Sequence, residues 1–233
     1  MKIGIIECGP VPAALQARYG SYPAMFAGQL APLLPGARFS TISVERGEAL
    51  AAPDTQDAWL LTGSRHGVYD DLPWIAPLKA FIRDAAAMKR PVVGVCFGHQ
   101  IIAEALGGRV EKAAAGWRVG LETYTTMLDG NGAARSIALP AFHQDQVVVP
   151  PPGAEIVAHS PACAHAALRY MQAPVLSLQF HPEFSRPYLA DLIAVLGKQA
   201  EAPGLPANAT TDETGMRWIA DFLAETQPSA RQP

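Results

Sequence analysis

The 233-residue chain is predicted to fold as an α/β protein: a doubly wound, mostly parallel sheet with flanking helices and a small antiparallel section. Three observations predict this class. Short β-branched strands alternate with amphipathic helices through residues 2–106, the pattern of a parallel sheet covered on both faces. Short strands separated by proline- and glycine-rich turns follow in residues 109–178. The composition, 49% hydrophobic and 17% charged, is that of a compact globular protein.

The first part of the chain supplies four strands of this sheet. The first strand is an isoleucine-rich run that ends at a Gly-Pro pair, which breaks extended structure. The helix before the fourth strand places Ile75, Leu78 and Ile82 on one stripe, so one of its faces is expected to be buried. The expected strands are residues 2–8, 37–44, 58–61 and 92–95, and the expected helices are residues 24–34, 74–89 and 99–106.

The fourth strand and the helix after it meet at Cys96, which lies between Gly94 and Gly98. Flanking glycines permit a strand-to-helix turn too tight for side chains, and such a turn holds a nucleophile at the carboxyl end of a strand. The start of a helix contributes partial positive charge and free N–H groups, which favour a thiolate. A cysteine more often simply packs, but packing requires neither the two glycines nor the turn. The pattern therefore predicts a nucleophile at position 96.

The second part of the chain predicts the antiparallel section, one further buried strand and two helices. Residues 1–200 are expected to form the catalytic domain, and residues 201–233 are expected to be a linker and a C-terminal helix that packs on the same domain. A capping-box signal at residues 210–213 precedes that helix. The expected elements are strands 118–126, 146–149, 155–159, 166–170 and 174–180, a helix at 187–198, and a last helix with Met216, Ile219, Phe222 and Leu223 on one face.

His181, Pro182 and Glu183 directly follow the strand at 174–180. A thiolate nucleophile needs a base to take and return a proton, and the base needs a third group that fixes its tautomer. Proline disfavours helix for the residue before it, so His181 and Glu183 are expected in extended backbone with their side chains on the same side. A lone histidine after a strand is more often structural. Together with the cysteine turn, however, it indicates a base and its carboxylate partner.

Composition excludes several other classes of function. A net charge of -3 offers no basic surface for nucleic acid, and no apolar run approaches the length of a membrane span. We therefore expect a cytoplasmic protein without a nucleic-acid or membrane partner. Cys8, Cys96 and Cys163 stand at unrelated spacings, so neither a disulfide framework nor a zinc site is expected. No other cluster has metal-ligand spacing and no phosphate-binding loop is present, so no metal and no cofactor are expected.

Two separated motifs carry a family resemblance. Residues 94–100 (GVCFGHQ) and 179–183 (QFHPE) resemble the class I (triad-type) glutamine amidotransferases, and most closely the stand-alone members related to the glutaminase domain of GMP synthetase. The resemblance spans nearly the whole chain. It implies a flavodoxin-like doubly wound sheet, a triad of Cys96, His181 and Glu183, and hydrolysis of the γ-amide of glutamine through a glutamyl thioester.

The resemblance also implies roles around this triad. Gly63, at the carboxyl end of the third strand, and the N–H of Phe97 are expected to form an oxyanion hole. Gln100, His143 and Asp145 are expected to contact the substrate. The match is weaker at two places, because relatives have Ser-His-x-Asp-x-Val where this chain has FHQDQV at 142–147, and Gly-Gly-Pro or Gly-Ser-Pro where it has GSRH at 63–66.

The sequence leaves three functions open. Ammonia released by this family usually passes to a synthetase, and this chain has no ATP-binding domain, so a separate synthetase subunit would have to receive it. Alternatively, the chain is a stand-alone hydrolase of γ-glutamyl peptides. A third alternative is a non-catalytic or redox-sensing module that keeps the cysteine for oxidation or binding, although a sensor has no need of His181 and Glu183.

Overall fold

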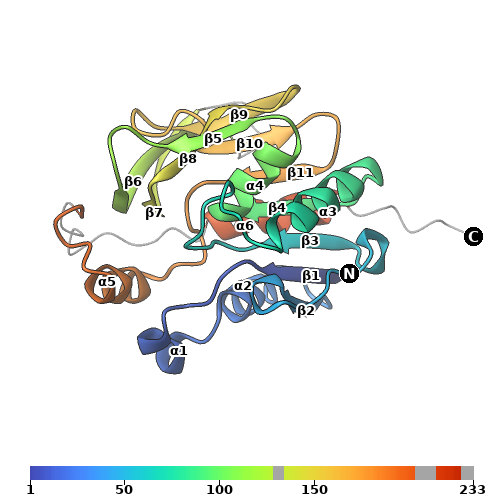
Figure 1. The fold of residues 1–233 in the computed structure, drawn as a ribbon, viewed down its shortest axis with the longest axis horizontal. Helices are drawn as coiled ribbons and strands as arrows, with labels where there is room; N and C mark the ends of the chain where they lie inside the picture. Colours follow the sequence, from blue (N-terminus) through green and yellow to red (C-terminus); the bar gives the residue numbers. More distant parts are fainter. Residues whose placement is uncertain (128–133, 203–213, 227–233) are drawn as a thin grey trace, which may run out of the picture.

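The computed structural model describes residues 1–127, 134–202 and 214–226, and its main feature is a nine-stranded sheet (Figure 1). Five neighbouring strands run parallel, in the order β2-β1-β3-β4-β11. Because the chain passes from β2 back across β1 to β3, the helices between the strands cover both faces of this part of the sheet. The parallel strands are β1 (Lys2–Glu7), β2 (Arg38–Ser43), β3 (Ala58–Leu61), β4 (Val92–Val95) and β11 (Val175–Leu178).

The antiparallel section continues the same sheet beyond β11. Its order is β10-β9-β6-β7, and β6 and β7 pair along their full length, from Arg118 opposite His143 to Thr126 opposite Arg135. A separate two-stranded sheet pairs β5 with β8 and places Lys112 opposite Asp145. These strands are β5 (Arg109–Lys112), β6 (Arg118–Thr126), β7 (Arg135–His143), β8 (Asp145–Val149), β9 (Ala154–His159) and β10 (Ala167–Tyr170).

Alternation along the parallel strands divides the core into two layers. Ile3 and Ile5 face one side of the sheet and pack with α2 and α6, whereas Ile6 and Trp59 face the other side and pack with α3 and α4. Strands buried on both faces are apolar at every position, which explains the unbroken hydrophobic runs in the sequence. The covering helices are α2 (Tyr22–Leu30), α3 (Ile75–Ala87), α4 (Phe97–Ala105) and α6 (Thr214–Glu225).

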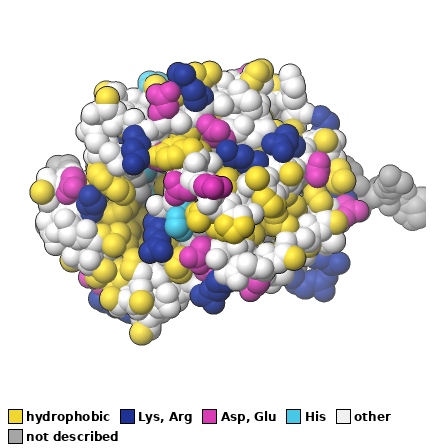
Figure 2. All heavy atoms as spheres, in the orientation of Figure 1, with side chains coloured by type: hydrophobic (Ala, Val, Ile, Leu, Met, Phe, Trp, Pro, Cys, Tyr) yellow, Lys and Arg dark blue, Asp and Glu magenta, His cyan; other side chains and the backbone are white. Residues whose placement is uncertain are grey.

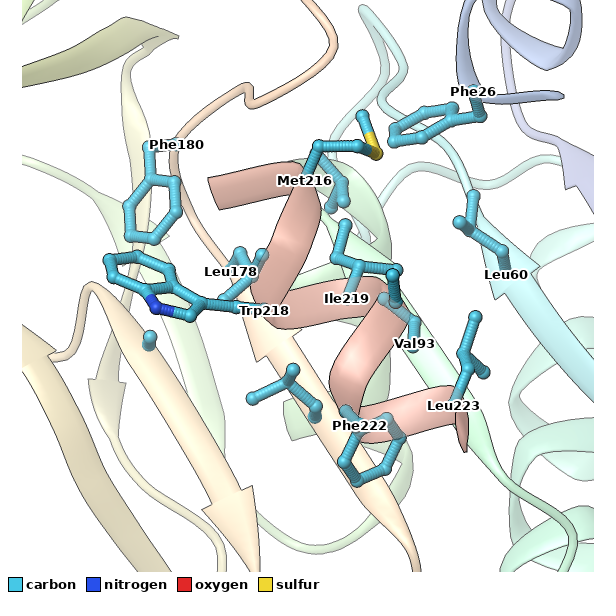
Figure 3. Close-up of a cluster of buried hydrophobic side chains, with 14 of the residues drawn as sticks. Phe26, Leu60, Val93, Leu178, Phe180, Met216, Trp218, Ile219, Phe222 and Leu223 are labelled. Atoms are coloured by element: carbon cyan, nitrogen blue, oxygen red, sulfur yellow. The ribbon is translucent and has the colours of Figure 1, made fainter. Parts of the chain in front are cut away.

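Helix α6 packs into the layer that also contains α2 (Figure 3). The predicted apolar face is confirmed, since Ile219 and Leu223 are fully buried and Met216 and Phe222 nearly so. Trp218 adds an edge-to-face contact with Phe180, immediately before His181, at a centroid separation of 6.2 Å. The last helix therefore supports the strand end that carries the histidine. The capping box at 210–213 and the linker at 203–208 lie outside the described residues.

Most predicted elements are confirmed, including the α/β class with a parallel sheet, flanking helices and an antiparallel extension. The helix expected at 24–34 instead begins at Tyr22, because the Ser21 side chain caps it, and ends at Leu30. Pro140 lies inside β7, a position that disguises a strand in sequence but is tolerated here because β7 is at the sheet edge. Strands β5 and β7 and helix α1 (Ala13–Tyr19) were not predicted from the sequence, while α5 (Arg186–Val195) matches the helix expected at 187–198.

Helices α1 and α5 contact each other and form a third apolar cluster with Val119 and Phe184. This cluster lies beside the residues that follow β11, so it forms one wall of the region where the parallel strands end. No helix among residues 1–127, 134–202 and 214–226 is both long and apolar enough to span a bilayer.

Candidate active site

Cys96 connects β4 to α4 in a backbone conformation that is rare for a residue with a side chain, with φ 53° and ψ -104°. A Cβ on Gly94 would lie 2.5 Å from the carbonyl of Gly98, and a Cβ on Gly98 would lie 2.5 Å from the carbonyl oxygen of Leu61. The glycines are thus required for close packing of strand, turn and helix, while the strain falls on Cys96 itself. A strained residue of this kind costs about 1–3 kcal/mol and typically marks a functional turn.

The three cysteines differ in their access to ligands. Cys96 is 6% exposed and lines a cavity of about 590 Å³ at the carboxyl ends of the parallel strands. Cys8 and Cys163 are buried away from this cavity. Burial, as the largest effect, raises the pKa of Cys8 well above its usual value and that of Cys163 to about 12. Both are therefore held as neutral thiols, which are poor nucleophiles.

The structure brings His181 and Glu183 into direct contact. The Nδ1 atom of His181 lies 2.8 Å from Oε1 of Glu183, and both side chains are almost fully buried. The expected extended backbone is wrong, because Pro182 and Glu183 form a turn in which the N–H of Phe184 donates to the carbonyl of His181 at 3.3 Å. The turn lets two residues so close in sequence face each other. The carboxylate fixes Nδ1 as the protonated nitrogen and leaves Nε2 free.

Phe184 holds the imidazole from one face. Its ring stacks on His181 with centroids 4.0 Å apart and planes 9° apart, and Tyr22 stacks on Phe184 in turn. An aromatic face attracts a cation, so this stack favours the imidazolium form. The role of Phe184 was not predicted from the sequence. The signal that could have identified it is an aromatic residue directly after the His-Pro-Glu segment.

Cys96 and His181 are neighbours across the turn. A Cβ placed on Gly63 would lie 3.2 Å from Cε1 of His181 and 3.7 Å from Cβ of Cys96, so all three residues meet at one point. Burial lowers the pKa of His181, but the charges of Glu183 and Cys96 oppose it more strongly and raise the pKa to about 10. Nε2 has no hydrogen-bond acceptor at good geometry among the described residues. The imidazole is therefore cationic at neutral pH, with its free nitrogen on the side of the sulfur.

Two backbone N–H groups face the same place. Gly63 directly follows the loop residue after β3, and Phe97 is the first residue of α4. Neither N–H donates a hydrogen bond within the described part of the chain. Buried backbone donors are nearly always paired, so two free donors beside a strained cysteine are available to an oxygen atom of a ligand.

Gln100, His143 and Asp145 lie together on another wall of the cavity. The Gln100 side-chain amide donates to the carbonyl of Asp145 at 2.9 Å, and Nδ1 of His143 lies 3.2 Å from the same carbonyl. The Asp145 carboxylate accepts from the hydroxyl of Tyr69 at 2.7 Å, which ties the loop after β3 to β8. Tyr69 was not predicted as a site residue, although it lies in the same loop as Gly63.

Two histidines near this wall are buried in the neutral form. His99 is fully buried, with Nδ1 2.7 Å from the hydroxyl of Ser177. Burial, followed by the charges of His143 and His165, lowers the pKa of His99 to about 3. Burial, followed by the charge of His181, does the same for His143. Within residues 1–127, 134–202 and 214–226, no group of three or more His, Cys, Asp or Glu side chains is arranged to hold a metal ion.

These buried histidines predict a loss of stability in acid. An unfolded histidine titrates near 6.5, so between pH 6.5 and about 3 the unfolded chain binds a proton that folded His99 does not. The free energy of unfolding therefore falls as the pH drops through this range, by about 1.4 kcal/mol per pH unit for each such histidine. Denaturant unfolding measured from pH 7 to pH 4 should show a shallower slope, by that amount, in His99→Asn.

His159 provides the control for this experiment, because it is exposed on β9 and His159→Asn should leave the slope unchanged. Equal slopes in wild type and His99→Asn would show that His99 is not the group responsible.

The fold and the site together define an α/β protein with a strained cysteine at a strand-to-helix turn, beside a paired histidine and glutamate. Residues 55–189 match the family "Glutamine amidotransferase class-I", more than half of the chain. The chain belongs to the class I glutamine amidotransferase family, which is a family of enzymes.

The relatives fall into two named groups. Gamma-glutamyl peptidase 4 of Arabidopsis thaliana is 29% identical over 185 residues, which cover 75% of this chain and 72% of that protein. A glutamine-hydrolyzing GMP synthase subunit of Methanocaldococcus jannaschii is 36% identical over 113 residues, 48% of this chain and 60% of that one. Among solved structures, a glutamine amido transferase from Methylobacillus flagellatus shares the fold, with a TM-score of 0.79 and 22% identity over 100% of this chain and 98% of that chain.

Proposed function

We propose that the chain is a cysteine hydrolase that cleaves γ-glutamyl amides through a glutamyl thioester. The observation that carries this proposal is the meeting of Cys96, His181 and Gly63 at one point of a cavity, with Glu183 2.8 Å behind the imidazole. Residues 1–200 would carry this machinery, and the packing of α6 behind Phe180 supports assigning the C-terminal helix to the same domain.

Each residue has a separate task in the proposed reaction. The Cys96 sulfur attacks the γ-carbonyl carbon, and the negative charge that develops on the carbonyl oxygen is stabilised by the N–H groups of Gly63 and Phe97. One such donor typically contributes about 3–4 kcal/mol to lowering the barrier. His181 gives its Nε2 proton to the nitrogen of the departing amine as the carbon–nitrogen bond breaks. Glu183 holds the imidazole in the required tautomer.

The second half of the reaction returns the enzyme to its starting state. Water attacks the thioester carbon while His181, now neutral, accepts a proton from that water. The carbon–sulfur bond then breaks, releasing glutamate and restoring the thiolate and imidazolium. Gln100, His143 and Asp145 would contact the glutamyl end of the substrate, because they share one wall of the cavity beside Cys96.

Two substrates fit this chemistry. Free glutamine would release ammonia, and the relatives named as GMP synthase subunits favour a role in which a separate synthetase subunit receives it. A γ-glutamyl peptide would release an amino acid or peptide, and the relatives named gamma-glutamyl peptidase favour this interpretation over a larger share of the chain. The cavity of about 590 Å³ has room for a ligand larger than glutamine.

The proposal is tested by measuring glutamate released from glutamine and from γ-glutamyl dipeptides, and by treating the protein with an electrophilic glutamine analogue. We expect glutamate release and a single covalent adduct at Cys96, located by peptide mass spectrometry. Cys8 and Cys163 are internal controls, because both are buried with raised pKa values and should stay unmodified. No glutamate and no adduct at Cys96 would refute the proposed function.

A further inference from the structure

Two cationic side chains line the cavity that contains Cys96. Arg65 comes from the loop after β3, and Lys112 comes from the end of β5, so they approach the cavity from different elements. Both are exposed, and neither forms an ion pair or a side-chain hydrogen bond within the described part of the chain. On the face shown in Figure 2, basic, acidic and histidine side chains border hydrophobic surface.

The acidic side chains of the cavity are already in use. The Asp70 carboxylate accepts from the N–H of Gly67 at 3.0 Å and lies 3.5 Å from Nδ1 of His66. The Asp145 carboxylate accepts from the Tyr69 hydroxyl at 2.7 Å. Among the described residues that line the cavity, the charges left for a ligand are therefore positive, which suits a ligand that carries carboxylates.

The two cations lie toward different ends of the proposed substrate. Lys112 is opposite Asp145 in the β5–β8 pair, on the side of the wall expected to contact the glutamyl end. Arg65 is two residues beyond Gly63, the residue closest to the imidazole of His181. Because His181 is the group that gives a proton to the departing amine, Arg65 lies on the amine side of the scissile bond.

We infer that Arg65 binds a carboxylate on the amine side of a γ-glutamyl amide, so that the preferred substrates are γ-glutamyl amino acids or peptides with a free carboxylate. This inference rests on the proposed function. Free glutamine has one carboxylate, on its glutamyl end, whereas a γ-glutamyl peptide has one at each end and so matches both cations. Arginine suits this role because its guanidinium can donate two parallel hydrogen bonds to a carboxylate.

The apolar surface near these cations fits the remainder of such a substrate. Trp117 and Phe142 pack edge to face with centroids 5.6 Å apart, and Leu192 and Leu196 from the α5 region line the cavity with them. Ammonia would leave this surface uncovered, whereas the side chain of a departing amino acid would cover it.

The test compares three substrates that differ only on the amine side: γ-glutamyl-alanine, γ-glutamyl-alanine amide and glutamine. We expect kcat/KM for γ-glutamyl-alanine to exceed that of its amide by about tenfold, the typical effect of a hydrogen bond to a charged group. Arg65→Gln should abolish this preference. Added salt should weaken the preference in the wild type, because both cations are exposed and salt screens such charges.

Two further variants show whether the effect is specific. Lys112→Gln should lower kcat/KM for all three substrates by a similar factor, since every substrate has the same glutamyl end. Arg83→Gln on α3 is the matched control, because Arg83 is exposed and does not line the cavity, and it should leave all three values unchanged. Binding of γ-glutamyl-alanine and its amide to Cys96→Ala, measured by calorimetry with and without Arg65→Gln, gives the same comparison without turnover.

The outcomes separate the two proposals. Hydrolysis that depends on Cys96 but shows no preference for the free carboxylate, or a preference that survives Arg65→Gln, would overturn the inference and leave the proposed function standing. Failure to hydrolyse or bind any of the three compounds, with no adduct at Cys96, would overturn both.

Discussion

Replacing Cys96 with alanine is expected to abolish release of glutamate, lowering kcat by at least about 10⁴-fold. The substitution removes the sulfur that forms the thioester, and neither of the other two cysteines lies at the cavity to replace it. Alanine keeps a Cβ at the strained φ of 53° and therefore keeps the packing of the turn. Steady-state kinetics with a γ-glutamyl dipeptide measures the loss.

The control is Cys8→Ala, which removes a buried thiol outside the cavity and should retain near-wild-type kcat. Thermal unfolding of both variants confirms that they remain folded. Activity retained in a folded Cys96→Ala protein would contradict the thioester mechanism, because no covalent intermediate could then form at this position.

Replacing His181 with glutamine is expected to lower kcat by about 10³-fold or more, because the departing amine loses its proton donor and the thiolate loses its cationic partner. The side-chain amide can still donate to Glu183, so the buried carboxylate keeps a hydrogen-bond partner. In the wild type, activity should fall as the pH rises through about 10, where the imidazolium loses its proton. The pH dependence of kcat/KM measures this alkaline limb, which should be absent in His181→Gln.

A double variant makes the test sharper. Residues that act as a unit are not additive, so Cys96→Ala/His181→Gln should be no slower than Cys96→Ala alone. The same histidine variant separates a hydrolase from a redox sensor, because a sensor requires only a reactive thiol. If His181→Gln turned over substrate at the wild-type rate, the triad would be wrong and the sensor interpretation would gain support.

Local patterns were sufficient to predict the parallel half of the fold. β3, β4 and β6 begin and end at the residues expected, because each combines a β-branched or apolar run with a clear turn signal. Cys96 could be singled out in advance because Gly94 and Gly98 are sequence features of the turn. The edge strand β7 could not, because its proline contradicts the usual pattern and only the pairing with β6 shows that the position is tolerated.

The surroundings of the site were less predictable because they depend on distant segments. Nothing near Arg65 in sequence indicates that Lys112 lines the same cavity, and nothing near Tyr69 indicates its bond to Asp145. The stack of Phe184 on His181 depends on the turn at Pro182, where the sequence predicted extended backbone.

The sequence by itself determined the class of fold, the family resemblance and the identity of the three residues proposed as a triad, because turn glycines, β-branched runs and a His-Pro-Glu segment are local chemical signals. Only the tertiary structure decided that Cys96, His181 and Gly63 meet, which of the described donors and cations are left for a ligand, and how the cavity is walled. Those properties depend on side chains brought together across β3, β4, β8 and β11, and such distances are set by packing of the whole sheet.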